Sequence, residues 1–273
     1  MKDELRDAAN TAQQVKRSAP FTVAARSGFV VSGLLHILIG IIAIRLAFGK
    51  SGSADLSGAV AQVASDPGGL VLLWIGGASC SILCLWHIGN AVLDHGHGQG
   101  SGVGRTMSSA AQGIAFGILA VTFVSFALGR ATNSGKSTSD WTARVLTLPL
   151  GRVALIALGA VVAAVGVGFA IRGLGRMFRK KLNLPPAGPT RTAVTVLGVV
   201  GYIAKGVILV LVGVLFIMAT LQARPQQSTG LDGALKGLRA QPYGAYVLTL
   251  VGAGLICYGL YLIVKARFAS MEG

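Results

Sequence analysis

The chain has 273 residues, of which 53% are hydrophobic and only 12% are charged, and its formal net charge is +15. A soluble domain carries roughly 25% charged residues, so one water-soluble core could not hide this much apolar surface. The basic residues lie at the ends of apolar stretches and in short connections, which membrane topology explains; a nucleic-acid partner is not expected.

Six apolar stretches approach the ~20 residues that a helix needs to cross a bilayer. We therefore expect an all-α integral membrane protein with six transmembrane helices. In chain order the predicted spans are Gly28–Phe48, Gly69–Val92, Met107–Leu128, Leu150–Ile171, Val196–Leu221 and Tyr243–Val264.

The lysines and arginines that flank these spans predict the orientation of the chain. With the N-terminus in the cytoplasm, fourteen basic residues lie in cytoplasmic segments and seven lie in outer segments. Cytoplasmic loops are the ones enriched in lysine and arginine. Both termini are therefore predicted to be cytoplasmic.

The most specific feature of the sequence is a two-helix hairpin that occurs three times in tandem. The first helix of a copy opens with two glycines five residues apart, as at Gly28–Gly33 and Gly201–Gly206, and Ser108 replaces the first glycine in copy 2. The second helix opens with Pro-x-Gly, and proline at a helix start sacrifices no intrahelical bond. These openings are Pro67-Gly68-Gly69, Pro149-Leu150-Gly151 and Pro242-Tyr243-Gly244.

Each of the six predicted helices also has two small residues seven positions apart. Residues two turns apart share one helix face, so each pair predicts a seam where two backbones approach closely. The positions are Gly33, Gly40, Gly77, Cys84, Gly113, Ala120, Gly159, Gly166, Gly206, Gly213, Gly252 and Gly259. A second close-packing face is predicted in helix 4 at Ala160, Ala164 and Gly168.

Because every unit has two spans, the copies share one orientation, and a pseudo-threefold bundle of hairpins is expected. In the third copy, Leu231 to Leu238 suits a short amphipathic helix between the two spans. The predicted organisation is a cytoplasmic N-terminal segment 1–24, repeat 1 at 25–93, a Gly/His-rich cytoplasmic loop 94–104, repeat 2 at 105–172, a basic linker 173–192 and repeat 3 at 193–267.

These features resemble a bacterial membrane family catalogued as domain of unknown function 1206. The resemblance is based on Gly28–Gly33, on Gly201–Gly206 and on the stretch from Gly233 to Gly244, and copy 2 departs from it most at Ser108. It implies three tandem two-helix units and a location in the bacterial inner membrane. It implies no activity.

Lys205 is the basic residue that lies well inside a predicted span, and no Asp or Glu occurs in any span to pair with it. A charge inside the membrane costs ~2.5–3.5 kcal/mol on insertion scales, so such a residue is a functional candidate. Its long side chain could also reach lipid phosphates at the interface. The corresponding residues in the other copies are Ser32 and Gln112, and Arg45 and Arg152 are further candidates for binding an anionic ligand or lipid.

Histidines and cysteines in the first two spans raise a haem or metal hypothesis. His36 and His87 are predicted at similar depth on two spans, and Cys80, Cys84 and His87 share one helix face. Buried cysteine more often acts as a small apolar filler, and a membrane histidine often only hydrogen-bonds between helices. A weak metal site in the loop at Asp94-His95-Gly96-His97 is less plausible than a flexible linker.

No Ser-His-Asp, paired-carboxylate or HExxH arrangement is visible in the sequence, so an enzyme is not expected. The first hypothesis is an accessory or scaffold subunit of a larger membrane complex, with anionic lipid on its cytoplasmic side. A small transporter or channel for an anionic or lipid-like solute is the alternative. A b-type haem or metal protein that uses His36 and His87 is a further alternative.

Overall fold

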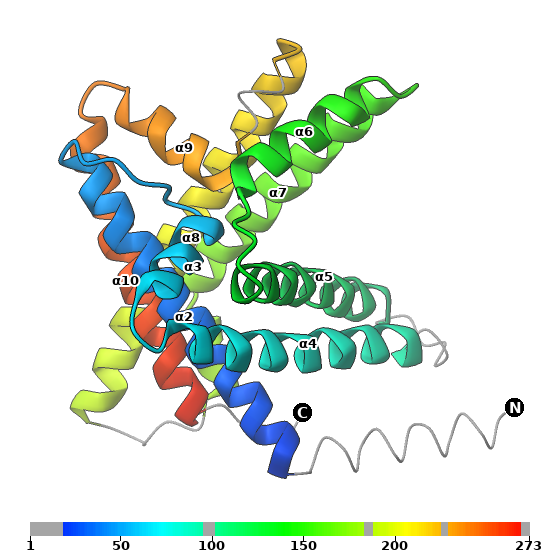
Figure 1. Ribbon diagram of the computed structural model, residues 1–273. Coiled ribbons are helices and arrows are strands. Elements are labelled where there is room, and N and C mark those ends of the chain that lie inside the picture. Colours follow the sequence, from blue (N-terminus) through cyan, green and yellow to red (C-terminus); the bar gives the residue numbers. More distant parts are fainter. Residues whose placement is uncertain (1–18, 95–101, 183–187, 225–228, 269–273) are drawn as a thin grey trace, which may run out of the picture. The chain divides into compact units, whose positions relative to one another are not determined.

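The computed structural model describes residues 19–94, 102–182, 188–224 and 229–268 (Figure 1). In these ranges the chain forms long helices joined by short ones. The long helices are α2 (Ala19–Ala47), α4 (Gly69–Asp94), α5 (Gly102–Ala127), α7 (Gly151–Leu174), α8 (Pro189–Leu221) and α10 (Gly244–Phe268). The short ones are α3 (Leu56–Ser65), α6 (Ser134–Leu146), η1 (Met177–Lys181) and α9 (Gly230–Arg239).

All six predicted spans are helices that are long and apolar enough to cross a membrane. Most of the helices extend beyond the apolar stretches, and α2 does so most of all, since it begins at Ala19 and not at Gly28. Helix α8 has 33 residues. At 1.5 Å per residue this helix is about 50 Å long, against about 30 Å for the hydrocarbon core of a bilayer. The Gly/His-rich loop around His95 and His97 lies outside the described residues.

By their contacts the helices group into two compact units. One unit comprises the described residues of 1–31 and 63–130, so it contains the first part of α2 together with α4 and α5. The other comprises 32–62 and the described residues of 131–269, with the rest of α2 and α6 to α10. In the first unit α4 and α5 lie side by side (Figure 1).

Three seams of small residues join the long helices, and each seam lies within one unit. Between α7 and α8, a methyl group on Gly159 would lie 2.9 Å from the Gly213 carbonyl oxygen. Between α2 and α10, one on Gly40 would lie 2.6 Å from the Gly252 carbonyl oxygen. Between α4 and α5, one on Gly117 would lie 3.2 Å from Cys84 Sγ. In the first two seams only glycine lets the backbones approach this closely, whereas the nearest contacts between α4 and α5 are with side chains.

The seams follow one rule of connectivity. Each joins the second long helix of one copy to the first long helix of the next: α4 to α5 and α7 to α8. The third seam follows the same rule: α10, the second long helix of copy 3, packs against α2, the first long helix of copy 1. The same order of helices therefore recurs in the three seams, while the glycine-to-carbonyl contacts occur, among the described residues, at α7–α8 and α2–α10.

The second close-packing face predicted for the fourth span, which is α7, has no partner helix within its own unit. Ala160 and Ala164 are exposed on α7, and a methyl group on Gly168 would meet nothing within 4 Å. Four-residue spacing of small side chains creates a smooth face without specifying a partner helix.

The Pro-x-Gly motif forms the same sharp turn in all three copies. The middle residue has a positive φ, at +81° in Gly68, +65° in Leu150 and +61° in Tyr243. The N–H of the following glycine donates to the carbonyl oxygen three residues earlier, at 2.9 Å in copies 1 and 2 and 2.8 Å in copy 3. That glycine has no room for a side chain, because a methyl group on Gly69 would collide with the Val63 carbonyl.

Each turn connects a short helix to a long one, and α9 occupies the stretch where an amphipathic helix is predicted. The equivalent helices α3 and α6 were not predicted from the sequence. Their N-terminal ends touch: the Ser134 N–H donates to Ser57 Oγ at 3.1 Å, joining α6 to α3. The Ala54 N–H, just before α3, donates to Asp232 Oδ1 of α9 at 2.9 Å. Helices α6 and α9 are also in contact.

Candidate functional site at Lys205

Helix α10 organises the candidate site because two helices pack on it closely. Its Gly252 faces Gly40 of α2, and its Gly259 faces Gly33 of the same helix. On another face, a methyl group on Gly201 of α8 would lie 2.5 Å from Tyr258 Cα. The glycine therefore allows the Tyr258 backbone to lie against α8, one helical turn from Lys205. The result places side chains of α2, α8 and α10 together in one unit.

Lys205 lies half-buried in the middle of α8 and contacts α10. Its Nζ donates to Tyr258 Oη at 3.3 Å and lies 4.4 Å from the centroid of the same ring. It also lies 5.0 Å from the centroid of Phe169 on α7. The ammonium is thus held between α7 and α10 by one phenol oxygen and two aromatic faces, which attract cations electrostatically.

A group of packed aromatic rings surrounds this contact. Tyr202, one turn before Lys205, stacks on Phe178 of η1 at 5.2 Å and meets Tyr258 edge-on at 5.5 Å. Tyr261 meets both Tyr202 and Phe178 edge-on, at 5.4 and 5.2 Å. Tyr258, Tyr261 and Phe178 are 5%, 1% and 5% exposed. We call these rings, with Phe169, His36 and Lys205, the Lys205 cluster.

His36 joins the cluster from α2. Its ring meets Tyr258 edge-on, with centroids 4.9 Å apart. Its Nδ1 donates to the Ser32 carbonyl oxygen, one turn earlier on the same helix, at 2.7 Å. The cluster therefore draws on all three copies: α2 belongs to copy 1, α7 to copy 2, and α8 and α10 to copy 3.

The other anion-binding candidates lie elsewhere. Arg45 is exposed nine residues after His36, roughly 13 Å further along α2. Arg152, at the start of α7, donates from Nη2 to the Leu221 carbonyl at 2.8 Å, so it satisfies a carbonyl at the end of α8. Gln112 is exposed on α5 and belongs to the other unit. Of these candidates, only Ser32 lies at the cluster, through its backbone.

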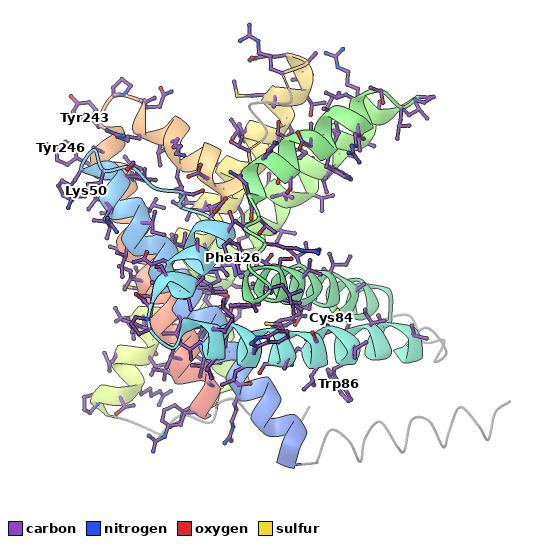
Figure 2. The ribbon with its side chains drawn as sticks, in the orientation of Figure 1. Lys50, Cys84, Trp86, Phe126, Tyr243 and Tyr246 are labelled. Atoms are coloured by element: carbon purple, nitrogen blue, oxygen red, sulfur yellow. The ribbon has the colours of Figure 1, made fainter. Side chains whose placement is uncertain are left out.

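Cys80, Cys84 and His87 lie on α4, and the last two face α5. Cys80 is 1% exposed, and Cys84 lies on the side of α4 that faces α5, opposite Trp86 (Figure 2). The His87 ring stacks on Phe116 of α5 at 5.6 Å, and its buried Nδ1 has no hydrogen-bond partner among the residues that the structure describes. Within the described ranges, no three His, Cys, Asp or Glu side chains converge as a metal site would require.

The aromatic members of the cluster were not predicted from the sequence. Two spacings contained a usable signal: Tyr202 and Lys205 are three residues apart, and so are Tyr258 and Tyr261, so each pair shares a helix face. Three of the five tyrosines lie in the cluster. The other two, Tyr243 and Tyr246, project from the N-terminal end of α10 at 80% and 78% exposure, as residues of a membrane interface do (Figure 2).

Six apolar helices, three tandem repeats and a lysine within a span define a multi-pass helical membrane protein. The chain belongs to the family described as Domain of Unknown Function (DUF1206), whose model matches residues 27–94, 107–176 and 200–269. It is similar to an uncharacterized Bacillus subtilis protein, YxxB, with 30% identity over 251 residues that cover 90% of each chain. No solved structure shows significant similarity to this chain.

Proposed function

We propose that this chain is a non-enzymatic accessory or scaffold protein of the bacterial inner membrane that holds an anionic lipid headgroup at Lys205. In this proposal both termini lie in the cytoplasm. The chain is back on the cytoplasmic side after four spans, so the N-terminal end of α8 at Pro189 is cytoplasmic. The close glycine seams support a rigid body, and the half-buried ammonium of Lys205 supports the lipid site. The Lys205 ammonium is the observation on which the proposal depends.

The charge of Lys205 is only partly compensated by its neighbours. An ammonium group has three N–H donors, and Tyr258 Oη accepts one of them in a long bond of 3.3 Å. Each aromatic face contributes about 0.5–2 kcal/mol. No Asp or Glu lies in any of the six spans, so no carboxylate of these helices neutralises the charge. An anion from the bilayer supplies the missing charge and accepts the remaining N–H groups.

Native mass spectrometry of protein extracted gently from its own membranes tests this proposal. We expect the wild type to retain anionic lipid and Lys205→Met to lose it, while Lys205→Arg keeps most of it. Arg152→Met is the matched control, because Arg152 is an exposed cation bonded to the end of α8. Equal lipid retention by Lys205→Met and the wild type would refute the lipid site. Co-purified subunits in the same spectra would support the accessory role.

A transporter of an anionic or lipid-like solute is the second candidate, and one observation favours it. The Lys205 cluster combines side chains from all three copies, and transporter sites commonly lie where internal repeats meet. Reconstituted vesicles discriminate between the candidates. Movement of anionic lipid or solute across the bilayer that Lys205→Met abolishes would favour transport, whereas tight retention without movement would favour the accessory protein.

A further inference from the structure

His36 has its hydrogen-bonding pattern fixed by the backbone of its own helix. Its Nδ1 lies 2.7 Å from the Ser32 carbonyl oxygen. A carbonyl oxygen can only accept, so Nδ1 bears the hydrogen of this bond. In the neutral imidazole the other nitrogen, Nε2, then carries the lone pair and acts as an acceptor.

This acceptor is unused. Among the described residues Nε2 of His36 has no hydrogen-bond partner, and it is not closed off from the surface. The imidazole and the Lys205 ammonium both lie against the Tyr258 ring, at 4.9 and 4.4 Å from its centroid. The cluster therefore presents a cation with spare N–H donors and a neutral acceptor on the same aromatic side chain.

A plain anion would engage only half of this arrangement. It would accept from Lys205 and leave Nε2 without a donor, and in a span that nitrogen has no water to replace it. A headgroup that bears an ammonium would offer a donor, but it would place a second positive charge beside Lys205. A hydroxyl group meets the requirement without added charge.

Building on the proposed lipid site, we infer that the headgroup is an anionic phosphodiester that carries a hydroxyl group. A phosphate oxygen accepts from Lys205 Nζ, and the hydroxyl donates to His36 Nε2. Lys205 then provides affinity for the anion, and His36 selects among headgroups of equal charge. The Tyr258 ring holds both side chains in place.

Two lipids of equal charge test this selectivity. Phosphatidylglycerol has hydroxyl groups in its headgroup, and phosphatidylmethanol with the same acyl chains has none. Delipidated full-length protein in detergent is titrated with each lipid, and bound lipid is counted by native mass spectrometry. A single neutral hydrogen bond predicts that the wild type binds phosphatidylglycerol about 2- to 10-fold more tightly.

Variants of His36 assign the preference to its ring nitrogen. His36→Phe keeps an aromatic ring against Tyr258, and His36→Leu introduces a side chain smaller than phenylalanine. Two variants are used because one of the two side chains could pack poorly at this position. Both variants should still bind lipid, but with equal affinity for phosphatidylglycerol and phosphatidylmethanol. His87→Phe is the control, because His87 lies in the other unit and stacks on Phe116. It should keep the wild-type preference.

The outcomes separate this inference from the proposed function. If Lys205→Met binds both lipids as well as the wild type does, the lipid site itself is wrong. If binding depends on Lys205 but the wild type shows no preference, only the hydroxyl inference falls. It falls as well if the preference survives in either His36 variant.

Discussion

Gly40 on α2 and Gly252 on α10 oppose each other so closely that neither has room for a methyl group. A methyl group on Gly40 would lie 2.6 Å from the Gly252 carbonyl oxygen, and one on Gly252 would lie 2.8 Å from that of Gly40. We expect Gly40→Ala and Gly252→Ala each to lower the stability by about 1–3 kcal/mol, because the helices must separate. Thermal unfolding in detergent, followed by circular dichroism, measures the change.

Gly168→Ala on α7 is the control for this prediction. A methyl group there meets nothing within 4 Å, so alanine should leave the stability unchanged or raise it by up to about 1 kcal/mol. If all three substitutions lower the melting temperature equally, the close approach of the helices is not the cause.

In copies 2 and 3 the turn before the second helix holds a non-glycine residue in the left-handed backbone region, a strain that glycine should relieve. Leu150 has a φ of +65° and is 79% exposed, so its side chain gains little packing in return for the strained backbone. Leu150→Gly should raise stability by about 1 kcal/mol, the ordinary cost of a left-handed non-glycine residue. Gly68→Ala, at φ +81°, should lower it by a similar amount. Urea unfolding of both variants gives the two signs, and equal signs would contradict the prediction.

The spans and the repeat could be predicted from sequence because they depend on local properties. Long apolar runs give helices wherever they are placed, and Pro-x-Gly constrains its own turn, although the left-handed residue is leucine or tyrosine in two copies and is not visible as a pattern. Lys205 stands out because it is a charge in an apolar run. Tyr258 does not, since its importance arises only when α10 packs against Gly201 of α8. The spacing of small residues does not predict which helices pack together, because the face of α7 at Gly168 has the spacing but no partner in its unit.

Asp232 should matter more to the connecting helices than its visible ion pair indicates. It pairs with the exposed Lys236 one turn along α9, but its Oδ1 also accepts the Ala54 N–H at 2.9 Å. Asp232→Ala should destabilise by about 1–2 kcal/mol because it leaves that N–H without its partner. Lys236→Ala should cost no more than about 0.5 kcal/mol, the contribution of an exposed i,i+4 pair. Melting temperatures that order the two variants the other way would contradict this.

Lys205 should lower the stability of the lipid-free protein. A partly compensated ammonium in a span is unfavourable, so Lys205→Met should unfold at a higher temperature than the wild type when both are delipidated, by about 1–3 kcal/mol in free energy. Adding anionic lipid should stabilise the wild type and leave Lys205→Met unchanged. Unfolding curves with and without lipid measure both effects. An equal response of the two proteins to lipid would contradict the prediction.

The seam between α2 and α10 has a consequence for how the protein is made. The other two seams join helices that follow each other along the chain, so each can close as soon as its second helix is inserted. The glycine face of α2 is synthesised first but receives its partner last, after every other span. Ribosome-bound intermediates therefore leave Gly33 and Gly40 facing lipid until α10 emerges. A premature stop before Gly244 removes that closing helix altogether and leaves the same face of α2 without its partner.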